Sequence, residues 1–451
     1  MEILELFFQT LADFLWRDWM LVLLLGLGVF YTIMTDFVQF RFFPYVIKSF
    51  IDEVRHKNAA ERENGKYSSY QALCTAVASC VGSGNIVGVS TAVLSGGPGA
   101  LFWMWAAAVL GMATKFAEIT LGVCYHGRNE KNEIIGGPMY YIAHAFRAEW
   151  AGSLAAVLLF IQNAGATIIQ SNTIAGVAKE AFFLPPAATG LILAVLMTCV
   201  ISGGFQRLVH TAEKIVPVMA VLYIFGGLYV ICMNITSLPG VLVSIVRGAF
   251  TLKAGTGAVA GLTMKEAMRY GVARGLYSNE AGEGSAAVLH ASAQVDHPVR
   301  QGMFGIMEVF IDTILLCTTT GVTVLITGAA ETHSTASTLA AAAFGSVLPG
   351  LQYVIYISLL LFAGTSIMSQ WYFGHVSLNY LKKARGADIY RMLFPLLIIL
   401  GSLSTIELVW SIQDCALAFL ILPNVAALVL LAPEVRRLTK EFSDPENGYI
   451  K

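Results

Sequence analysis

Long apolar stretches recur along the whole chain, separated by short polar segments. A transmembrane helix needs roughly 20 mainly apolar residues to cross the hydrocarbon core of a bilayer, and about eleven stretches reach that length. We therefore predict an all-α polytopic membrane protein. The expected spans are residues 18–36, 70–95, 99–125, 151–180, 187–203, 213–234, 263–293, 302–329, 350–381, 390–406 and 408–432.

The composition agrees with this fold class. Hydrophobic residues make up 56% of the chain, charged residues make up 13%, and the mean hydropathy is +0.68, which exceeds what a soluble core can bury. This apolar excess indicates a lipid bilayer as the surrounding medium, and the net charge of −1 provides no basic surface for a nucleic acid. The cysteines occur singly, without a CxxC pair, so we expect neither a structural metal nor a redox cofactor.

The distribution of basic residues predicts the orientation, because Lys and Arg concentrate on the cytoplasmic side of membrane proteins. Alternate connections carry Arg55, Lys57, Arg62 and Lys66, then Arg128 and Lys131, then Arg207 and Lys214, then Lys382, Lys383, Arg385 and Arg391, and finally Arg436, Arg437 and Lys440. This pattern places the N-terminus outside and the C-terminus in the cytoplasm of a plasma (inner) membrane. The basic residues Arg247 and Lys253 in an external connection are an exception, so we expect an amphipathic helix over 241–250 on the outer face.

Glycine-rich interruptions occur at corresponding places in two halves of the chain. With the first span set aside, about five spans remain in each half, and the first of each half is interrupted, at 81–85 and at 278–282. This pattern predicts a 5+5 inverted repeat with two broken helices and one extra N-terminal helix. Residues 1–69 are expected to contain the N-terminal helix, an interfacial helix over 37–50 and a cytoplasmic loop. The two five-helix repeats are expected at 70–234 and 263–432, joined by an external amphipathic connection at 235–262. A cytoplasmic tail is expected at 433–451.

The first interruption offers groups that suit an amino-acid substrate and a cation. Unpaired amides beside Ser83, Gly84 and Asn85 would hold a carboxylate, since the start of a half-helix carries partial positive charge. The Asn85 amide oxygen and the freed carbonyls of Ser79 and Cys80 would offer oxygen ligands to sodium. The alternative is that the glycines only permit close packing of helices.

Polar residues on other spans extend this hypothesis. Carbonyls near Tyr277 would receive the substrate ammonium under the tyrosine ring, although a tyrosine in the core or facing lipid is an alternative. Thr365 and Ser366 lie three and four positions beyond the carbonyl of Phe362, a spacing that suits sodium ligation, although such hydroxyls also bond the preceding helical turn. Gln170 would face the same space.

Three acidic residues within predicted spans are candidates for an ion or proton site, because charges inside a membrane are costly. Glu280 would brace the second break by accepting backbone N–H groups. Glu283 would line a cytoplasmic vestibule or carry a proton. Asp312, four residues after Glu308, would line an ion site or bond to its neighbours.

Four segments together resemble the alanine or glycine:cation symporter family. They are residues 81–118 (VGSGNIVGVSTAVLSGGPGALFWMWAAAVLGMATKFAE), 136–142 (GGPMYYI), 273–286 (ARGLYSNEAGEGSA) and 297–313 (HPVRQGMFGIMEVFIDT), in the family's order. The resemblance implies a leucine-transporter-like fold and sodium-driven symport of alanine or glycine. It implies substrate contacts at Ser83, Gly84, Gln170, Tyr277 and Asn279, and sodium contacts near Asn85, Thr365 and Ser366.

Several residues depart from the family's usual pattern. Cys80 stands where arginine is expected, Tyr277 where phenylalanine is expected, Glu283 where an apolar residue is expected and Ala287 where proline is expected. Gln370 precedes a tryptophan displaced by one residue, or roughly 100° around the helix. A proton-coupled or larger-substrate carrier, for example of glutamine, is therefore an alternative. In that case Glu283 would be the proton site and Gln370 would bind the amide side chain of the substrate. We expect no obligate protein partner, and neither catalytic motifs nor a signalling domain that would favour an enzyme or a receptor.

Overall fold

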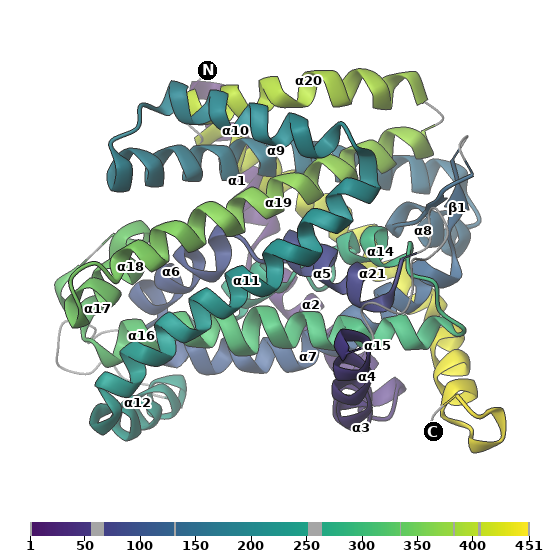
Figure 1. Ribbon diagram of the computed structural model, residues 1–451. Helices are drawn as coiled ribbons and strands as arrows, with labels where there is room; N and C mark the ends of the chain where they lie inside the picture. Colours follow the sequence, from purple (N-terminus) through teal and green to yellow (C-terminus); the bar gives the residue numbers. More distant parts are fainter. Residues whose placement is uncertain are drawn as a thin grey trace.

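The computed structural model describes residues 2–55, 67–129, 132–250, 264–333, 335–381, 384–404 and 407–449, and these residues are almost entirely helical (Figure 1). The strands within this part are β1 (Gly127–Arg128) and β2 (Ile134–Ile135), which pair antiparallel. Several basic residues used to predict orientation lie outside the described residues, namely Lys57, Arg62, Lys66, Lys131, Lys253, Lys382 and Lys383.

The helices of the first half, in chain order, are α1 (Glu2–Leu15), α2 (Asp18–Met34), α3 (Val38–Arg41), α4 (Phe43–Arg55), α5 (Ser69–Cys80), η1 (Ser83–Asn85), α6 (Val87–Gly96), α7 (Gly99–Cys124), α8 (Pro138–Phe146), α9 (Glu149–Phe182), α10 (Pro186–Ile201), α11 (Gly204–Met233), η2 (Ile235–Ser237) and α12 (Leu238–Phe250). The second half contains α13 (Met264–Asn279), α14 (Ser285–His290), α15 (Pro298–Val309), the π-helix η3 (Phe310–Cys317), α16 (Thr318–Ile326), α17 (Ala329–Thr332), α18 (Ala336–Val347), α19 (Gln352–Tyr380), α20 (Ala384–Leu403), α21 (Glu407–Ser443) and η4 (Pro445–Asn447).

Every predicted span coincides with one helix or with two or three consecutive helical elements. Among the described residues, seven helices are long and apolar enough to cross a membrane, and up to nine do so if each of two bent pairs is one span. The bent pairs are α1 with α2, at 43°, and α5 with the segment Ser83–Gly96, at 65°. The short α10 and the interrupted pair of α13 and α14 account for the rest of the expected spans, so the count of eleven and the inverted repeat stay predictions.

The connecting helices agree with the predictions in part. The structure has a helix over residues 241–250, within α12, as expected, and the position of this helix on the outer face stays a prediction. The single interfacial helix expected over 37–50 was wrong in one respect, because the chain forms two helices, α3 and α4, that meet at Phe42.

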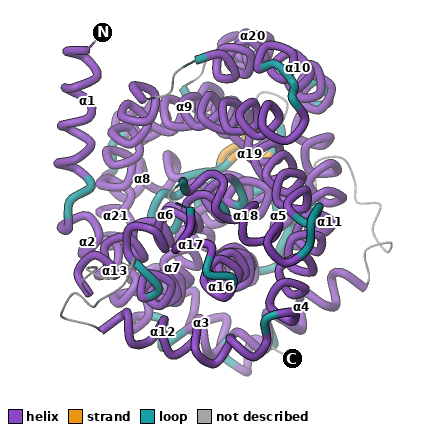
Figure 2. The backbone as a smooth tube through the Cα atoms, turned by 90° about the vertical axis from the view of Figure 1, so that its left-hand side faces the viewer, coloured by secondary structure: helices purple, strands orange, loops and turns teal. Residues whose placement is uncertain are grey.

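Helix α7 is largely buried and packs against α13, α14 and α15, and Figure 1 shows it running alongside α15. Gly122 makes this close approach possible, because a Cβ atom there would lie 2.6 Å from the Cβ of Ala287 in α14. The long helices α9 and α19 pack against each other, and α19 also packs against α5. Figure 2 shows α10 and α20 side by side at one end of the molecule and α1 at an edge.

The two helix interruptions are the irregular segments that position the site. At the first, α5 ends at Cys80 and Gly82 is extended before η1 begins. The second lies later than predicted, because α13 continues through Asn279. The left-handed residues Glu280 (φ +55°), Gly282 (φ +98°) and Gly284 (φ +78°) interrupt the chain before α14 begins. Two glycines make these backbone conformations inexpensive, which explains the displacement.

Candidate functional site

A cavity of about 730 Å³ lies among the first break, α9, α13 and α21. Ser83, Gly84 and Tyr277, which were predicted to contact substrate, all line it. The lining belongs to helix ends that the sequence predicts to face outside. Its charged residues are Glu180, Arg269, Arg274 and Asp414, two acidic and two basic.

One part of the cavity wall is formed by Gly84 and the ring of Tyr277. A Cβ atom on Gly84 would lie 3.5 Å from Cδ1 of Tyr277, an ordinary van der Waals contact. The ring of Tyr277 lies 6.1 Å from the ring of Trp410, measured between centroids. Because glycine adds no side chain, the space beside the tyrosine ring stays open to a ligand.

Oxygen atoms converge on Ser366 where the first break meets α19. Its Oγ lies 3.1 Å from each of the carbonyl oxygens of Ser79, Val81 and Phe362. Thr365 Oγ1 donates to the same Phe362 carbonyl at 3.0 Å. Both hydroxyls are buried. Carbonyl and hydroxyl oxygens are ligands that a small hard cation prefers, so the arrangement fits sodium.

The carbonyls at this break differ by one residue from those predicted. The second carbonyl that meets Ser366 belongs to Val81 rather than Cys80, because Val81 leaves the helix with a ψ of 103°. Gly82 lets α9 and α19 come close, since a Cβ atom there would lie 2.9 Å from both Gln170 Nε2 and Ser366 Oγ. Gln170 is therefore close to the first break, and its Oε1 is buried without a hydrogen-bond partner among the described residues.

Asn85 and Asp312 connect the first break to the second half of the chain. Asn85 Oδ1 accepts from the Gly82 amide at 2.9 Å, and its Nδ2 donates to Asp312 Oδ1 at 2.6 Å. Asp312 Oδ2 accepts from Ser278 Oγ at 2.9 Å and from Thr313 Oγ1 at 2.8 Å. Asp312 lies in the π-helix η3, a conformation common at functional sites. Polar groups from both halves thus meet at one fully buried carboxylate.

A chain of hydrogen bonds holds the second break from the side opposite the cavity. Glu118 Oε1 accepts from the Gly284 amide at 2.9 Å and from Asn424 Nδ2 at 2.8 Å. The same Asn424 nitrogen donates to the Gly282 carbonyl at 2.8 Å, and Tyr141 donates to Asn424 Oδ1 at 2.5 Å. These bonds join α7, α8 and α21 to the break, on the side that the sequence predicts to be cytoplasmic.

The acidic residues of the second break do not lie as expected. Glu280 accepts from Ser285 Oγ at 2.5 Å, and the bond to a backbone amide that was expected of it is made by Glu118. Glu283 is 6% exposed, so in this conformation it does not form the wall of a solvated vestibule. The side chain of Glu280 is long enough to reach across to α14, which leaves the break itself to Glu118.

Two other predicted residues lie apart from the cavity lining. Asn279 donates to Thr313 Oγ1 at 3.2 Å and accepts from the Ala281 amide at 3.1 Å, so its amide supports the turn. Gln370 is buried on α19, one turn beyond Ser366, and its Oε1 has no hydrogen-bond partner in the described part of the chain. Neither residue lines the cavity in this conformation.

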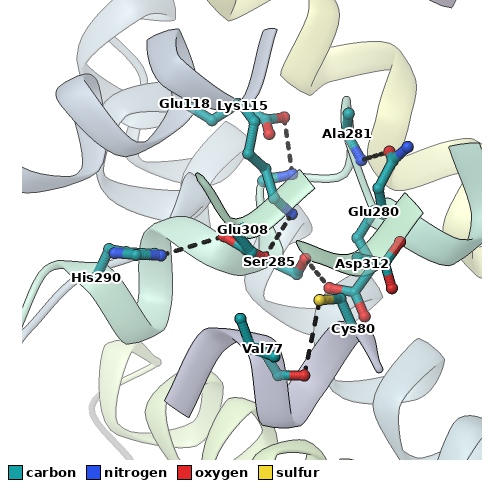
Figure 3. Close-up of polar contacts among 12 residues, drawn as sticks. Val77, Cys80, Lys115, Glu118, Glu280, Ala281, Ser285, His290, Glu308 and Asp312 are labelled. Carbon is teal, nitrogen blue, oxygen red and sulfur yellow. Dashed lines mark hydrogen bonds and ion pairs between the residues drawn. The ribbon is translucent and has the colours of Figure 1, made fainter. Parts of the chain in front are cut away.

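A buried ionic network lies beside the second break. Lys115 Nζ lies 3.2 Å from Glu308 Oε1, and the two side chains are 0% and 1% exposed. Glu308 Oε2 lies 3.1 Å from His290 Nε2, and Gln301 Nε2 lies 2.6 Å from His290 Nδ1. Figure 3 shows the Lys115 side chain extending toward Glu308 and His290, with Glu280 and Asp312 on the other side.

Sequence reasoning assigned no role to Lys115 and Glu118, although both lie in the segment that carried the family resemblance. Their signal was present: each is a charge inside a span predicted from apolar residues, which marks a functional candidate. Their spacing of three residues also places both on one face of α7, the face that meets the second break.

The broken helices, the cavity between them and the oxygen cluster define a multi-pass membrane transporter rather than an enzyme. Comparison with known proteins agrees. The chain matches the sodium:alanine symporter family over residues 1–448 and belongs to that family.

Relatives align along nearly the whole chain. The sodium/alanine symporter AgcS of Methanococcus maripaludis is 37% identical, covering 98% of this chain and 98% of the relative. The probable sodium/glutamine symporter GlnT of Bacillus subtilis is 35% identical, covering 98% and 91%. Among solved structures, that of MhsT in complex with L-phenylalanine superposes with a TM-score of 0.56 at 14% identity, covering 83% of this chain and 98% of MhsT. That similarity identifies the leucine-transporter-like fold.

Proposed function

We propose that this protein carries a small neutral amino acid, alanine or glycine, into the cell by sodium-coupled symport across the plasma membrane. The observation that carries the proposal is the convergence of the Ser79, Val81 and Phe362 carbonyls on Ser366, directly beside a cavity lined by Ser83 and Gly84. A cation at the oxygen cluster would fix the first break, and the break in turn forms part of the wall that receives the substrate.

The substrate's two charges suit the two broken helices. The carboxylate would lie against the amides of Ser83, Gly84 and Asn85, at the positive end of a half-helix. The ammonium would lie near the carbonyls at the end of α13, with the Tyr277 ring over the ligand. Because Gly84 leaves only a methyl-sized space before the ring of Tyr277, small side chains fit best beside it.

Alternating access is supported by the hydrogen bonds on the side opposite the cavity. The bonds from Tyr141 and Glu118 to Asn424, and from Glu118 to Gly284, close the route opposite the cavity. Opening that route requires these bonds to break while the cavity side closes. Sodium and substrate that both favour the closed intermediate raise each other's affinity by the same factor.

The direct test is uptake of labelled alanine by liposomes that contain the purified protein. We expect accumulation with an inward sodium gradient and none with an equal potassium gradient. Uptake driven by a proton gradient alone, or no alanine uptake under any gradient, contradicts the proposal.

A second candidate is a proton-coupled or larger-substrate symporter, and one observation favours it. The side-chain carbonyls of Gln170 and Gln370 are both buried without a hydrogen-bond partner among the described residues, as they would be if each received a substrate N–H. The relative GlnT, named a probable sodium/glutamine symporter, is in keeping with an amide substrate. Glutamine uptake that exceeds alanine uptake, and loss of proton-driven uptake in Glu283→Gln, would favour this candidate.

A further inference from the structure

One face of α7 is directed at the second helix break. Gly111, Lys115, Glu118 and Gly122 follow at helical spacing, and a Cβ atom on Gly111 would lie 3.2 Å from Ala281 Cβ. The glycines let the backbone of the break come close. The two charged residues between them therefore meet the break in a region that excludes water.

Carboxylates surround the ammonium of Lys115. Glu308 pairs with it directly, and Glu118 and Glu280 also act on it electrostatically. In turn, Lys115 attracts Glu118, Glu280, Glu283 and Glu308, and His290 also acts on Glu308. Beyond the ion pair, Lys115 Nζ has no hydrogen-bond partner in the part of the chain that the structure describes, and Glu118 Oε2 has none. A single tethered cation thus serves several buried acids.

The first break has a different composition. Its described hydrogen-bond partners are carbonyls, hydroxyls, the Asn85 amide and the carboxylate of Asp312, and none of these is a cation. Lys115 acts on Asp312 electrostatically, but among the described residues its ion pair is with Glu308. An incoming cation is therefore the group that this oxygen-rich site lacks. At the second break, the chain itself supplies the positive charge.

We propose that Lys115 is a tethered counter-cation that takes the place of a coupling ion at the second break, so that sodium from solution exchanges only on the side of the first break. Lys115 is then a specificity-determining residue that limits how many sodium ions accompany each substrate molecule. The inference rests on the sodium-coupled function proposed above.

Truncation of Lys115 provides the test. Lys115→Ala removes the charge and leaves space beside Glu308 and Glu118, whereas Lys115→Met removes the charge but fills the space, and Lys115→Arg keeps the charge. Each variant is reconstituted into proteoliposomes, and the uptake of labelled sodium and the uptake of labelled alanine are measured in parallel. We expect Lys115→Ala to carry about one more sodium ion per alanine than the wild type, because buried carboxylates left without their cation recruit another. Lys115→Arg should keep the wild-type ratio, and Lys115→Met should not gain an ion.

An unchanged ratio in an active Lys115→Ala variant overturns the inference. If that variant is not made in an active form, heat stability of the purified Lys115→Ala variant replaces uptake as the measurement. The protection that sodium, relative to potassium, gives this variant should exceed the protection of the wild type, and equal protection overturns the inference. Failure of the proposed function is distinguishable, because it would abolish sodium-driven uptake in the wild type itself.

Discussion

Replacing Ser366 with alanine tests the oxygen cluster at the first break most directly. The hydroxyl is buried, and its oxygen lies 3.1 Å from each of three carbonyl oxygens. These belong to Ser79 in α5, to Val81 just after α5 and to Phe362 in α19. Without a cation its proton satisfies one carbonyl at a time. With a cation bound, its lone pairs become a ligand, so the Ser366→Ala substitution removes a ligand and leaves the backbone carbonyls in place.

The magnitude follows from the contacts that are lost. A hydrogen bond or ligand contact to a charged group contributes about 1.5–3 kcal/mol, whereas a neutral hydroxyl bonded within a helix contributes about 0.5–1.5 kcal/mol to folding. Since about 1.4 kcal/mol corresponds to a tenfold change in affinity, sodium affinity should fall roughly 10-fold to 150-fold. The maximal uptake rate at saturating sodium should change much less.

The assay is alanine uptake into proteoliposomes as a function of external sodium concentration. Ser377→Ala is the matched control, because Ser377 is also a buried serine of α19. Within the described part of the chain its Oγ donates only to the Phe373 carbonyl of its own helix, at 2.8 Å. The control should leave the half-maximal sodium concentration unchanged. An equal shift in the two variants would refute sodium ligation by Ser366.

Three further predictions concern the breaks and the cavity. Glu118→Ala should lower the stability of the purified protein in thermal unfolding by about 1–3 kcal/mol for each of the two donors left unpaired. Glu118→Gln keeps the accepting oxygen and should therefore destabilise the protein much less. Equal losses of stability in the two variants would contradict the hydrogen bonds described. Gly122→Ala should cost about 1–3 kcal/mol by the same measurement, because its Cβ would meet α14 at 2.6 Å, while Gly26→Ala, with nothing within 4 Å, should not destabilise. Gly84→Ala should weaken alanine uptake about 10-fold to 100-fold and glycine uptake less, as measured by competition, because the new methyl group occupies the space beside Tyr277.

The apolar stretches alone placed most of the helices, because each segment that crosses lipid must satisfy its own backbone hydrogen bonds. The first break could also be predicted, since Gly82 and Gly84 interrupt an apolar span. The second break was predicted two residues early. The sequence offered Gly282 and Gly284 as well as Ser278, and only the packing against α7 determines which residues leave the helix.

Contacts between side chains that are far apart in the sequence were harder to predict. Thr365 and Ser366 were identified because their spacing to Phe362 is local. Glu118 was missed because its partner, the Gly284 amide, is 166 positions away along the chain. Long-range pairing depends on the packing of α7 against the second half, which no local pattern contains.

The length of α9 has a consequence for the surrounding bilayer. Its 34 residues correspond to about 51 Å at about 1.5 Å per residue, whereas the hydrocarbon core is about 30 Å thick. The helix must therefore tilt or extend beyond the acyl chains, and α19, which packs against it, must follow. Since Gln170 and Ser366 lie on these two helices, acyl-chain length in the lipid becomes a variable that can alter the geometry of the sodium site.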